Sequence, residues 1–383
     1  MQDAGVLLDR RENLKWQGVD TGVLAAWVAE MDVDLAPPVR AALHAAVDAG
    51  ATGYPPPDHL TGLPAATADW CRTAYGWAVV PADVRPVLDV LHGLALALTV
   101  LDPGGGPVVL PTPAYPPFFA VLERTGRPVV EVPLHRRGAG YSLDLDAIDA
   151  ALARGARTVL LCSPHNPTGT VFPADDLRAL AGIVERHGAR VVSDEVHAPL
   201  THPGHRHTPY ASVAPGHAVT LLSASKGWNV PGLKCAQVVL TADGDAARWE
   251  TVPAPERGAT PLGTAANTAA YAEGGPWLAA LHDELAANRA LLERLLAGLL
   301  PELVAAESAA TYLTWLDCTA TGLADPAAFF LEEARVALSD GSAFGAAGRG
   351  CVRLNHATSP AVLTEIVERM ADALRRRGAR RAG

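Results

Sequence analysis

The most informative chemical feature of this sequence is its small number of lysines. The chain has 383 residues and 31 lysines and arginines, of which only Lys15, Lys226 and Lys234 are lysines. Two of these three lie in the stretch LLSASKGWNVPGLK, residues 221–234. Arginine supplies positive charge as well as lysine does, but only the primary amine of lysine forms an imine with a carbonyl. Lys226, set among small and apolar residues, is therefore a candidate for Schiff-base chemistry, with an ordinary lysine retained by chance as an equal alternative.

Three polar residues at the ends of apolar runs are candidates for the same site. Asn166 lies in the turn SPHNPTG directly after an apolar run, where its amide either caps the turn or donates to a ligand oxygen. Asp194 ends the apolar run of VVSDEVH, and a carboxylate there is costly unless it has a partner such as a pyridinium nitrogen. Ser223 precedes Lys226 by three residues, and its hydroxyl could bind a phosphate.

Short apolar runs that alternate with amphipathic segments must position these side chains. Strands are expected at 107–111, 127–134, 158–163, 190–196, 218–225 and 235–241, with helices between them at 114–124 and 173–188. This alternation predicts an α/β fold with a mostly parallel, doubly wound sheet and helices on both faces. Such sheets bind their ligands at the carboxyl ends of the strands, where the candidate residues lie.

The pattern changes after residue 275, which indicates a second unit. A long helical pattern covers residues 276–300. It is followed by a strand-like segment at 311–317, a helical one at 325–336, a strand-like one at 351–355 and a final helix. We therefore predict a large domain at 46–275 and a smaller α+β domain at 276–383. The first 45 residues lack the α/β rhythm, and we expect this N-terminal segment, 1–45, to pack with the small domain.

Composition excludes several classes of function. Hydrophobic residues make up 49% of the chain and charged residues 19%, as in a globular protein. The apolar runs are too short to span a membrane, and the first residues lack the pattern of a secretory signal. The net charge of −10 argues against nucleic acid or an anionic membrane as a partner. The five scattered cysteines are typical of reduced thiols, so we expect a cytoplasmic protein.

Three further features do not support a site of their own. The glycines of DPGGGP (102–107) lack the order of a phosphate-binding loop and more simply join a helix to a strand. The histidines of HPGHRH (202–207) have no cysteine or carboxylate at metal-ligand spacing. Cys162 precedes the Asn166 turn, but no neighbour in the sequence would lower its pKa, and we expect it in the core.

The order and spacing of Asn166, Asp194 and Lys226 resemble those of fold type I pyridoxal-phosphate enzymes, the aspartate aminotransferase superfamily. Within it, the chain is most similar to the MalY/PatB-type cystathionine β-lyases, a carbon–sulfur lyase branch. The matching segments are LKW, WVAEMD, GY, TPAYPPFF, PHNPTG, SDEVH, SASKGWNVPGLK, TYLTWLD, ALSDGSAFG and CVRLNHA.

Individual positions refine this resemblance. The usual forms of two motifs are WVADMDF and SDEIH, so Glu30 replaces an Asp and Val33 a Phe, and both are conservative changes. His197 is more informative: many aminotransferases have a tyrosine three residues after the aspartate, whereas the lyase branch has a histidine. A purely structural histidine at a strand end remains the alternative.

The resemblance implies pyridoxal 5′-phosphate as the cofactor and gives roles to the residues around its ring. Lys226 would form the Schiff base and, once freed by the substrate, remove the proton from Cα. Asp194 would keep the pyridine nitrogen protonated so that the ring accepts electrons. Asn166 and His197 would bind the phenolic oxygen, and Tyr115 would stack on the ring, unless it is simply a core aromatic at the start of a helix.

The same resemblance implies a phosphate site. Ser223 and the backbone near Leu91 and His92, at a helix start, would hold the phosphate. The match is poorer there, because Asp89 and His92 stand where the family often has Gly and Pro. Lys234 occupies the place of a phosphate-binding arginine of many aminotransferases, and it is either a phosphate contact or a surface lysine.

Residues at the two ends of the chain would complete the active site. Tyr54 matches a tyrosine that reaches the phosphate of the neighbouring subunit, which implies a homodimer with shared active sites. Arg353 would bind the α-carboxylate of the amino-acid substrate through a bidentate pair of hydrogen bonds.

The implied reaction is β-elimination from cystathionine or another S-substituted L-cysteine, giving thiol, pyruvate and ammonia. An aminotransferase on the same fold is the alternative, because Lys226 can serve both reactions. A regulator that retains the fold is less well supported, since no added DNA-binding module is visible in the sequence. The sequence leaves the physiological substrate open.

Overall fold

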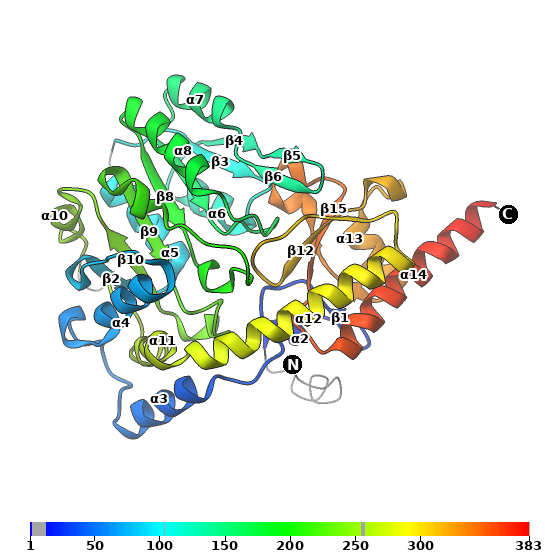
Figure 1. Ribbon diagram of the computed structural model, residues 1–383, viewed down its shortest axis with the longest axis horizontal. Helices are drawn as coiled ribbons and strands as arrows, with labels where there is room; N and C mark the ends of the chain where they lie inside the picture. The colour runs from blue at the N-terminus through cyan, green and yellow to red at the C-terminus, as the bar shows by residue number, and fades with distance from the viewer. Residues whose placement is uncertain (2–12, 103, 254–256, 383) are drawn as a thin grey trace.

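Short runs of mostly apolar residues build a seven-stranded sheet at the centre of the larger of two units (Figure 1). The structure is a computed structural model that describes residues 1, 13–102, 104–253 and 257–382. In spatial order the strands are β2 (Val84–Val87), β10 (Ala236–Leu240), β9 (Ala218–Leu222), β8 (Arg190–Asp194), β7 (Thr158–Cys162), β3 (Val108–Thr112) and β4 (Val129–Pro133). β10 is antiparallel to both of its neighbours, whereas the strands from β9 to β4 are parallel. The predicted, mostly parallel sheet is confirmed.

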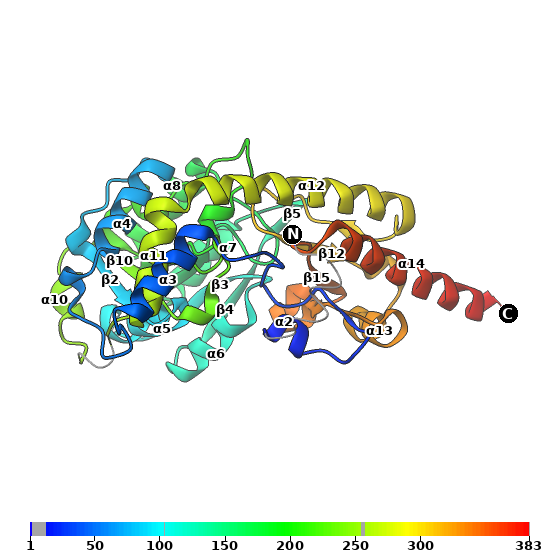
Figure 2. The same ribbon diagram turned by 90° about the horizontal axis from the view of Figure 1, so that it is seen from below.

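The two-residue period of a strand explains why helices cover both faces of this sheet. In β7, Val159 and Leu161 belong to the core beneath α7 and α8, whereas Leu160 and Cys162 belong to the core beneath α5 and α6. Figure 2 shows α5 and α6 on one side of the strands and α8 on the other. The helices of this unit are α4 (Leu63–Trp70), α5 (Val90–Leu96), α6 (Pro116–Arg124), α7 (Leu145–Ala153), α8 (Ala174–Arg186), α9 (Tyr210–Val213), α10 (Asp245–Trp249) and α11 (Pro261–Glu273).

All six strands expected in this part of the chain are present, but the sequence analysis missed three others. β2 has four residues and contains Pro86, and a proline argues against a strand unless it lies at an edge, as β2 does. β5 (His135–Arg137) and β6 (Gly140–Ser142) form a separate hairpin. β5 is exposed and charged, so it lacks the apolar alternation from which a strand is predicted.

The long helix α12 (Gly275–Leu299) joins the larger unit to the smaller one (Figure 1). Leu281 and Leu285 near its start pack into a core of the larger unit, and Leu292 and Leu296 near its end pack into the core of the smaller unit. The smaller unit contains an antiparallel sheet in the order β11 (Val304–Ala305), β12 (Leu313–Asp317), β15 (Cys351–Asn355) and β14 (Ser339–Asp340), with α13 (Pro326–Phe329) and α14 (Pro360–Ala382). α12 and α14 lie side by side in both ribbon views (Figure 2).

The N-terminal residues contact both units. α2 (Leu14–Gln17) and β1 (Leu24–Ala25) lie against the smaller unit, where β1 pairs in parallel with β13 (Val336–Ala337). α3 (Pro37–Asp48) instead packs against α11 of the larger unit. The division of the chain at residues 45 and 275 stays a prediction.

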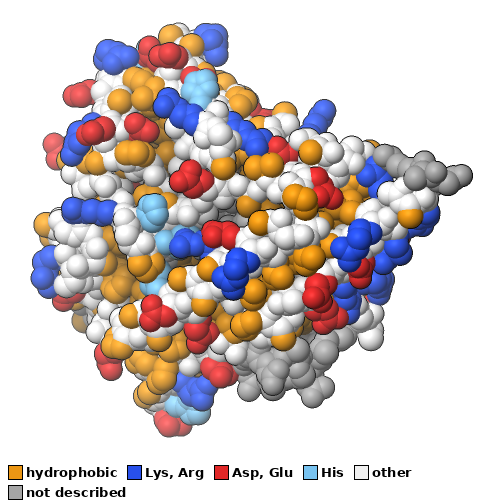
Figure 3. All heavy atoms as spheres, turned by 45° about the vertical axis from the view of Figure 1, so that its right-hand side comes forward, with side chains coloured by type: hydrophobic (Ala, Val, Ile, Leu, Met, Phe, Trp, Pro, Cys, Tyr) orange, Lys and Arg blue, Asp and Glu red, His pale blue; other side chains and the backbone are white. Residues whose placement is uncertain are grey.

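The surface of the smaller unit is basic along α14, where Figure 3 shows Lys and Arg side chains together with acidic ones. These arginines have acceptors within the chain: Arg375 pairs with Asp372, and Arg380 lies 2.7 Å from the carboxylate of Glu333. Across the described ranges, the helices are all too short or too polar to cross a membrane.

Candidate active site

One pocket at the sheet edge brings together most of the predicted site residues. Eight of the eleven predicted residues line it: Leu91, Tyr115, Asn166, Asp194, His197, Ser223, Lys226 and Lys234. His92, Tyr54 and Arg353 do not line it. Sequence reasoning missed Ala29, Val90, Val196, Pro231 and Cys235, which also face this pocket. Ala29 lies within the WVAEMD motif and Val196 within SDEVH, so the motifs pointed to these segments without identifying the residues.

The register of three parallel strands explains why distant residues meet in this pocket. Cys162 at the end of β7 is opposite Asp194 at the end of β8, and Asp194 is opposite Leu221 in β9. The three carboxyl ends therefore lie at one edge of the sheet, where side chains after the strands converge. Asn166 follows β7 and Lys226 follows β9, so both are carried to Asp194.

Lys226 lines the pocket from a half-buried position. Its Nζ donates a hydrogen bond of 2.9 Å to the carbonyl oxygen of Ala29. Desolvation of the amine and, after it, the positive charge of Arg353 lower the pKa of Lys226 to about 8. A substantial fraction of the amine is therefore neutral near physiological pH, which is the form that attacks a carbonyl.

Asp194 is a buried carboxyl with little stabilisation of its charge. Its side chain is 4% exposed and accepts one hydrogen bond, of 3.0 Å, from the Val196 N–H. Burial raises the pKa of Asp194 to about 7, against the opposing effect of that hydrogen bond. A ligand that carries a proton on a ring nitrogen would supply the missing partner.

Arg353 connects the smaller unit to Asn166. It lies in β15 and donates to Asn166 Oδ1 at 2.9 Å, to the Trp27 carbonyl oxygen at 2.9 Å and to Ser339 Oγ at 3.1 Å. Asn166 Oδ1 thus accepts from Arg353, and the amide nitrogen of Asn166 is the group that can donate to a ligand oxygen. Burial lowers the pKa of Arg353 to about 10, so the guanidinium remains charged at neutral pH.

His197 is buried beside these charged groups. Its Nδ1 has no hydrogen-bond partner among the described residues. Burial, followed by the nearby charges of Lys226 and Arg353, holds the pKa of His197 well below its usual range. The imidazole is therefore neutral, with a nitrogen left to bind a ligand.

The opposite end of the pocket differs from the expected phosphate site. The His92 N–H, predicted to face a phosphate, instead donates to Asp89 Oδ1 at 2.8 Å, because Asp89 caps α5. Asp89 Oδ2 accepts from Lys234 Nζ at 2.8 Å, so Lys234 faces the pocket as half of an ion pair. Burial acts to raise the pKa of Asp89, but the bonds from Lys234 and His92 outweigh it, and the pKa is lowered. Ser223 Oγ donates to the Cys235 carbonyl oxygen at 2.7 Å.

Two predicted aromatic residues differ in their surroundings. Tyr115 borders the pocket at the start of α6, and its ring meets that of Phe118 edge-on at 5.5 Å between centroids. Tyr54 lies in the loop before α4 and is fully exposed, so it contributes nothing to the pocket of its own chain.

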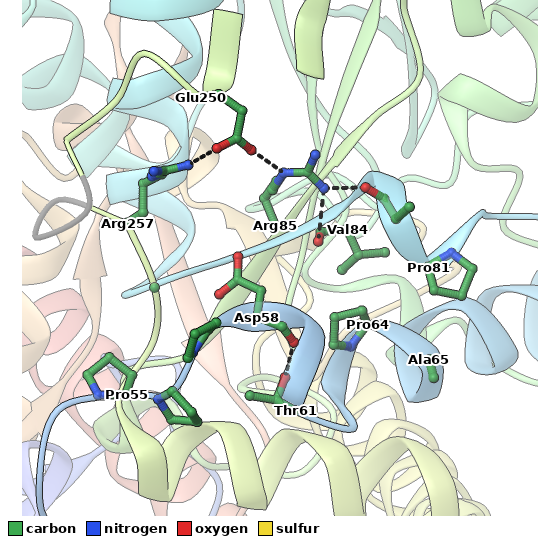
Figure 4. A pocket seen from close by; sticks show the side chains of 14 residues that line it. Pro55, Asp58, Thr61, Pro64, Ala65, Pro81, Val84, Arg85, Glu250 and Arg257 are labelled. Atoms are coloured by element: carbon green, nitrogen blue, oxygen red, sulfur yellow. Dashed lines mark hydrogen bonds and ion pairs between the residues drawn. The ribbon is translucent and has the colours of Figure 1, made fainter. Parts of the chain in front are cut away.

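A larger hollow lies elsewhere on the same unit, beside the segment that follows Tyr54 (Figure 4). Its volume is about 760 Å³, and Pro55, Pro56 and Pro57 line one side. Three of its charged groups bind one another: Figure 4 shows Glu250 between Arg257 and Arg85, with Arg85 Nε 3.8 Å from Glu250 Oε1. The hollow contains none of the predicted reactive residues, and the chemistry therefore belongs to the smaller pocket at Lys226.

The histidines of HPGHRH have separate partners. His202 Nε2 meets the Thr311 carbonyl oxygen at 2.8 Å, and His207 Nε2 lies 2.9 Å from the buried carboxylate of Glu195. These residues tie their loop to two different places in the fold.

Cys162, expected in the core, is buried but also borders the pocket, and burial raises the pKa of its thiol.

Comparison with known proteins agrees with this fold and site. The chain belongs to the family described as aminotransferase class I and II, whose model matches residues 28–370. It is 37% identical to the cystathionine β-lyase of Corynebacterium glutamicum over 372 residues, covering 96% of this chain and 98% of that protein. It is 33% identical to the cystathionine β-lyase PatB of Bacillus subtilis over 378 residues, covering 95% and 97%.

A solved structure extends the comparison to the fold. Cystalysin from Treponema denticola, whose crystal structure contains pyridoxal 5′-phosphate, has a TM-score of 0.89 and 26% identity, covering 96% of this chain and 97% of the other. The predicted resemblance to MalY/PatB-type lyases within the fold type I superfamily is confirmed.

Proposed function

We propose that this protein is a pyridoxal-phosphate-dependent carbon–sulfur β-lyase. Its substrate is cystathionine or another S-substituted L-cysteine, and its products are a thiol, pyruvate and ammonia. The observation that carries the proposal is one pocket at the sheet edge that is lined by Lys226, by the buried carboxyl of Asp194 and by the neutral imidazole of His197. The cystathionine β-lyases of two bacteria, similar over nearly the whole chain, support the same reaction.

The residues of the pocket fit this cofactor. An aldehyde needs a neutral amine, and Lys226 has its pKa lowered to about 8. A protonated pyridine nitrogen needs a buried carboxylate, and Asp194 has only one backbone hydrogen bond. When bound, pyridoxal phosphate withdraws electrons from the Cα of the attached amino acid and thereby acidifies its Cα–H bond.

Lys226 performs two roles in this proposal. Its neutral amine attaches the cofactor and, once displaced by the substrate amine, takes the proton from Cα. The Ala29 carbonyl holds the freed amine in place through the 2.9 Å hydrogen bond. Once the proton has left Cα, the thiolate would leave Cβ and take up a proton. Lys226 would then displace the remaining enamine from the cofactor, and water would hydrolyse the enamine to pyruvate and ammonia.

The residues around the ring and the phosphate have binding roles. Asp194 would hold the proton on the ring nitrogen, and the amide of Asn166 and the imidazole of His197 would bind the phenolic oxygen. Tyr115 would stack on the ring. The phosphate would be bound by Ser223, the backbone of Leu91, Lys234 and Tyr54 of the neighbouring subunit. His92 is less suited than Leu91, because its N–H is bound to Asp89.

Arg353 binds the substrate carboxylate. It is cationic and 4% exposed, and its contact with Asn166 links the carboxylate site to the ring site. A fixed carboxylate aligns the Cα–H bond for proton removal, which is a positioning effect.

We also propose a cytoplasmic homodimer with shared active sites, and domains at 46–275 and 276–383. The full exposure of the Tyr54 side chain in the single chain supports a contact with a second subunit. α12 packs into the cores of both units and therefore joins them. The proposed boundary at residue 275 lies at the start of this connecting helix.

Product analysis tests the proposed reaction. Purified enzyme with L-cystathionine and no keto acid should release homocysteine, pyruvate and ammonia in equal amounts. Alanine, which has no leaving group at Cβ, serves as the control substrate and should release none of these products. Lys226→Arg keeps the charge but cannot form the imine, and it should be inactive. Failure of several S-substituted cysteines to yield any thiol would contradict the proposal and favour the aminotransferase alternative.

A further inference from the structure

The third lysine of the chain, Lys15, lies outside the pocket and is more deeply buried than Lys226. Its side chain is 0% exposed, and its Nζ lies 2.7 Å from Asp32 Oδ2. Asp32 Oδ1 accepts a second bond, of 2.9 Å, from Trp16 Nε1. The Trp27 indole N–H donates back to the Lys15 carbonyl oxygen at 3.1 Å. Two buried opposite charges with these hydrogen bonds form a well-defined tether between α2 and the residues before Asp32.

The segment held by this tether, residues 26–32, has no regular secondary structure, and we call it the strap. Four of its backbone hydrogen bonds are made with the side chains of two asparagines. Asn355 Nδ2 donates to the Val28 and Glu30 carbonyl oxygens at 2.7 and 2.6 Å. The Asn229 amide accepts from the Met31 N–H and donates to the Met31 carbonyl, both at 2.8 Å. Asn355 belongs to the smaller unit and Asn229 to the larger, so the strap is fastened to both.

Two carbonyl oxygens of the strap accept hydrogen bonds from the two cationic side chains of the active site, Lys226 and Arg353. The Ala29 carbonyl accepts from Lys226 Nζ, and the Trp27 carbonyl accepts from Arg353, each at 2.9 Å. One irregular segment therefore sets the position of both the catalytic amine and the carboxylate-binding guanidinium. A shift of the strap would displace both groups together. A shift of β15 would displace only Arg353, and a shift of the segment after β9 would displace only Lys226.

We propose that Lys15 is a positioning residue whose ion pair with Asp32 fixes the strap, and through it the relative placement of Lys226 and Arg353. The proposal deepens the proposed lyase function and rests on it for its kinetic part. It also explains why a lysine is retained here: a compact ammonium fits the fully buried site beside Asp32, whereas a planar guanidinium presents a wider group.

The test compares the buried Lys15–Asp32 ion pair with a partly buried ion pair elsewhere in the fold. Lys15→Met/Asp32→Asn removes both charges of the tether, while the asparagine retains an acceptor for Trp16. The matched control, Arg190→Met/Asp245→Asn, removes the ion pair at the start of β8, at the opposite end of that strand from Asp194. Amide hydrogen exchange of the strap and kcat/KM for L-cystathionine are measured on both holoenzymes.

The expected result separates positioning from plain stability. The tether variant should show exchange of the strap amides at least about tenfold faster than the wild type, and kcat/KM lower by about 10- to 100-fold. The control should lose stability with both quantities near wild type. Strap exchange equal to that of the control, or faster exchange with unchanged kcat/KM, would overturn the proposal.

A milder variant keeps the test decisive if the tether variant does not fold. Trp16→Phe removes one hydrogen bond to Asp32, and it should produce smaller changes of the same sign; unchanged strap exchange would again refute the tether. A wild-type enzyme without lyase activity would contradict the proposed function, and the exchange measurement would still decide the structural role of Lys15.

Discussion

The pKa of Lys226 gives a prediction whose size follows from the structure. Burial lowers this pKa to about 8, compared with 10.5 for an ordinary lysine. At pH 7.5 an ordinary lysine is neutral in about one molecule in a thousand, whereas a lysine with a pKa near 8 is neutral in about a quarter. The fraction of reactive amine is therefore about 200-fold larger at Lys226 than at an exposed lysine.

The assay is imine formation between the cofactor-free protein and added pyridoxal phosphate, followed by absorbance as a function of pH. Rates are divided by those of a simple primary amine under the same conditions, after that reference rate has been expressed per neutral amine molecule; this cancels the ionisation of the aldehyde and leaves the titration of Lys226. The rate at Lys226 should rise with pH, reach half its maximum near pH 8 and then level off. Reduction with borohydride and peptide mapping should place the label on Lys226.

Two results would refute this reasoning. A midpoint near 10.5 would mean that Lys226 is not desolvated as the structure has it. Label recovered on Lys15 or Lys234 would mean that the reactive amine is a different one. Lys226→Arg is the control, and it should show no saturable imine formation.

Three further predictions concern other parts of the site. Arg353→Lys should raise KM for cystathionine by about 10- to 100-fold while the cofactor stays bound, because a single ammonium replaces a two-point contact; steady-state kinetics equal to wild type would exclude the carboxylate role. Asp194→Asn should lower kcat by at least about 100-fold. The same change should raise the Tm of the cofactor-free protein at pH 8. The folded pKa of Asp194 is about 7, so stability is lost as pH rises from about 4 through 7, by on the order of 4 kcal/mol at pH 8; a lower Tm at that pH would contradict the burial argument. An equal mixture of Tyr54→Ala and Lys226→Ala subunits, after exchange, should regain up to about a quarter of wild-type activity if the sites are shared, and none if each subunit has its own.

The sequence predicted the sheet and the main site because both depend on local patterns. The strands β7, β8 and β9 are apolar runs with polar residues directly after them, so Asn166, Asp194 and Lys226 were assigned to one sheet edge without coordinates. Because these three strands pair in parallel, their carboxyl ends lie at the same edge of the sheet. The roles assigned to these residues stay predictions until they are tested.

Other features depend on tertiary contacts that no local pattern reveals. The pairing of Lys15 with Asp32 joins residues 17 positions apart across an irregular segment, and neither periodicity nor a turn rule predicts it. The His92 N–H, expected at the phosphate site, is bound by Asp89 instead, because a helix cap competes with a ligand for the same donor. The rest of the phosphate site stays a prediction. β2 was missed because Pro86 argues against a strand when the neighbours of the segment are unknown.

The central claim is that the electron pair at Cα expels a thiolate, and one measurement tests it most directly. The enzyme is incubated with excess L-cystathionine and no keto acid, and the molecules of pyruvate released per active site are counted. A β-lyase regenerates its cofactor in every cycle, so the account predicts sustained release of many pyruvate molecules per site. An aminotransferase without an acceptor stops once each cofactor has taken up the amino group. Release of at most one keto-acid product per site, with full activity restored by an added keto acid, would contradict the account.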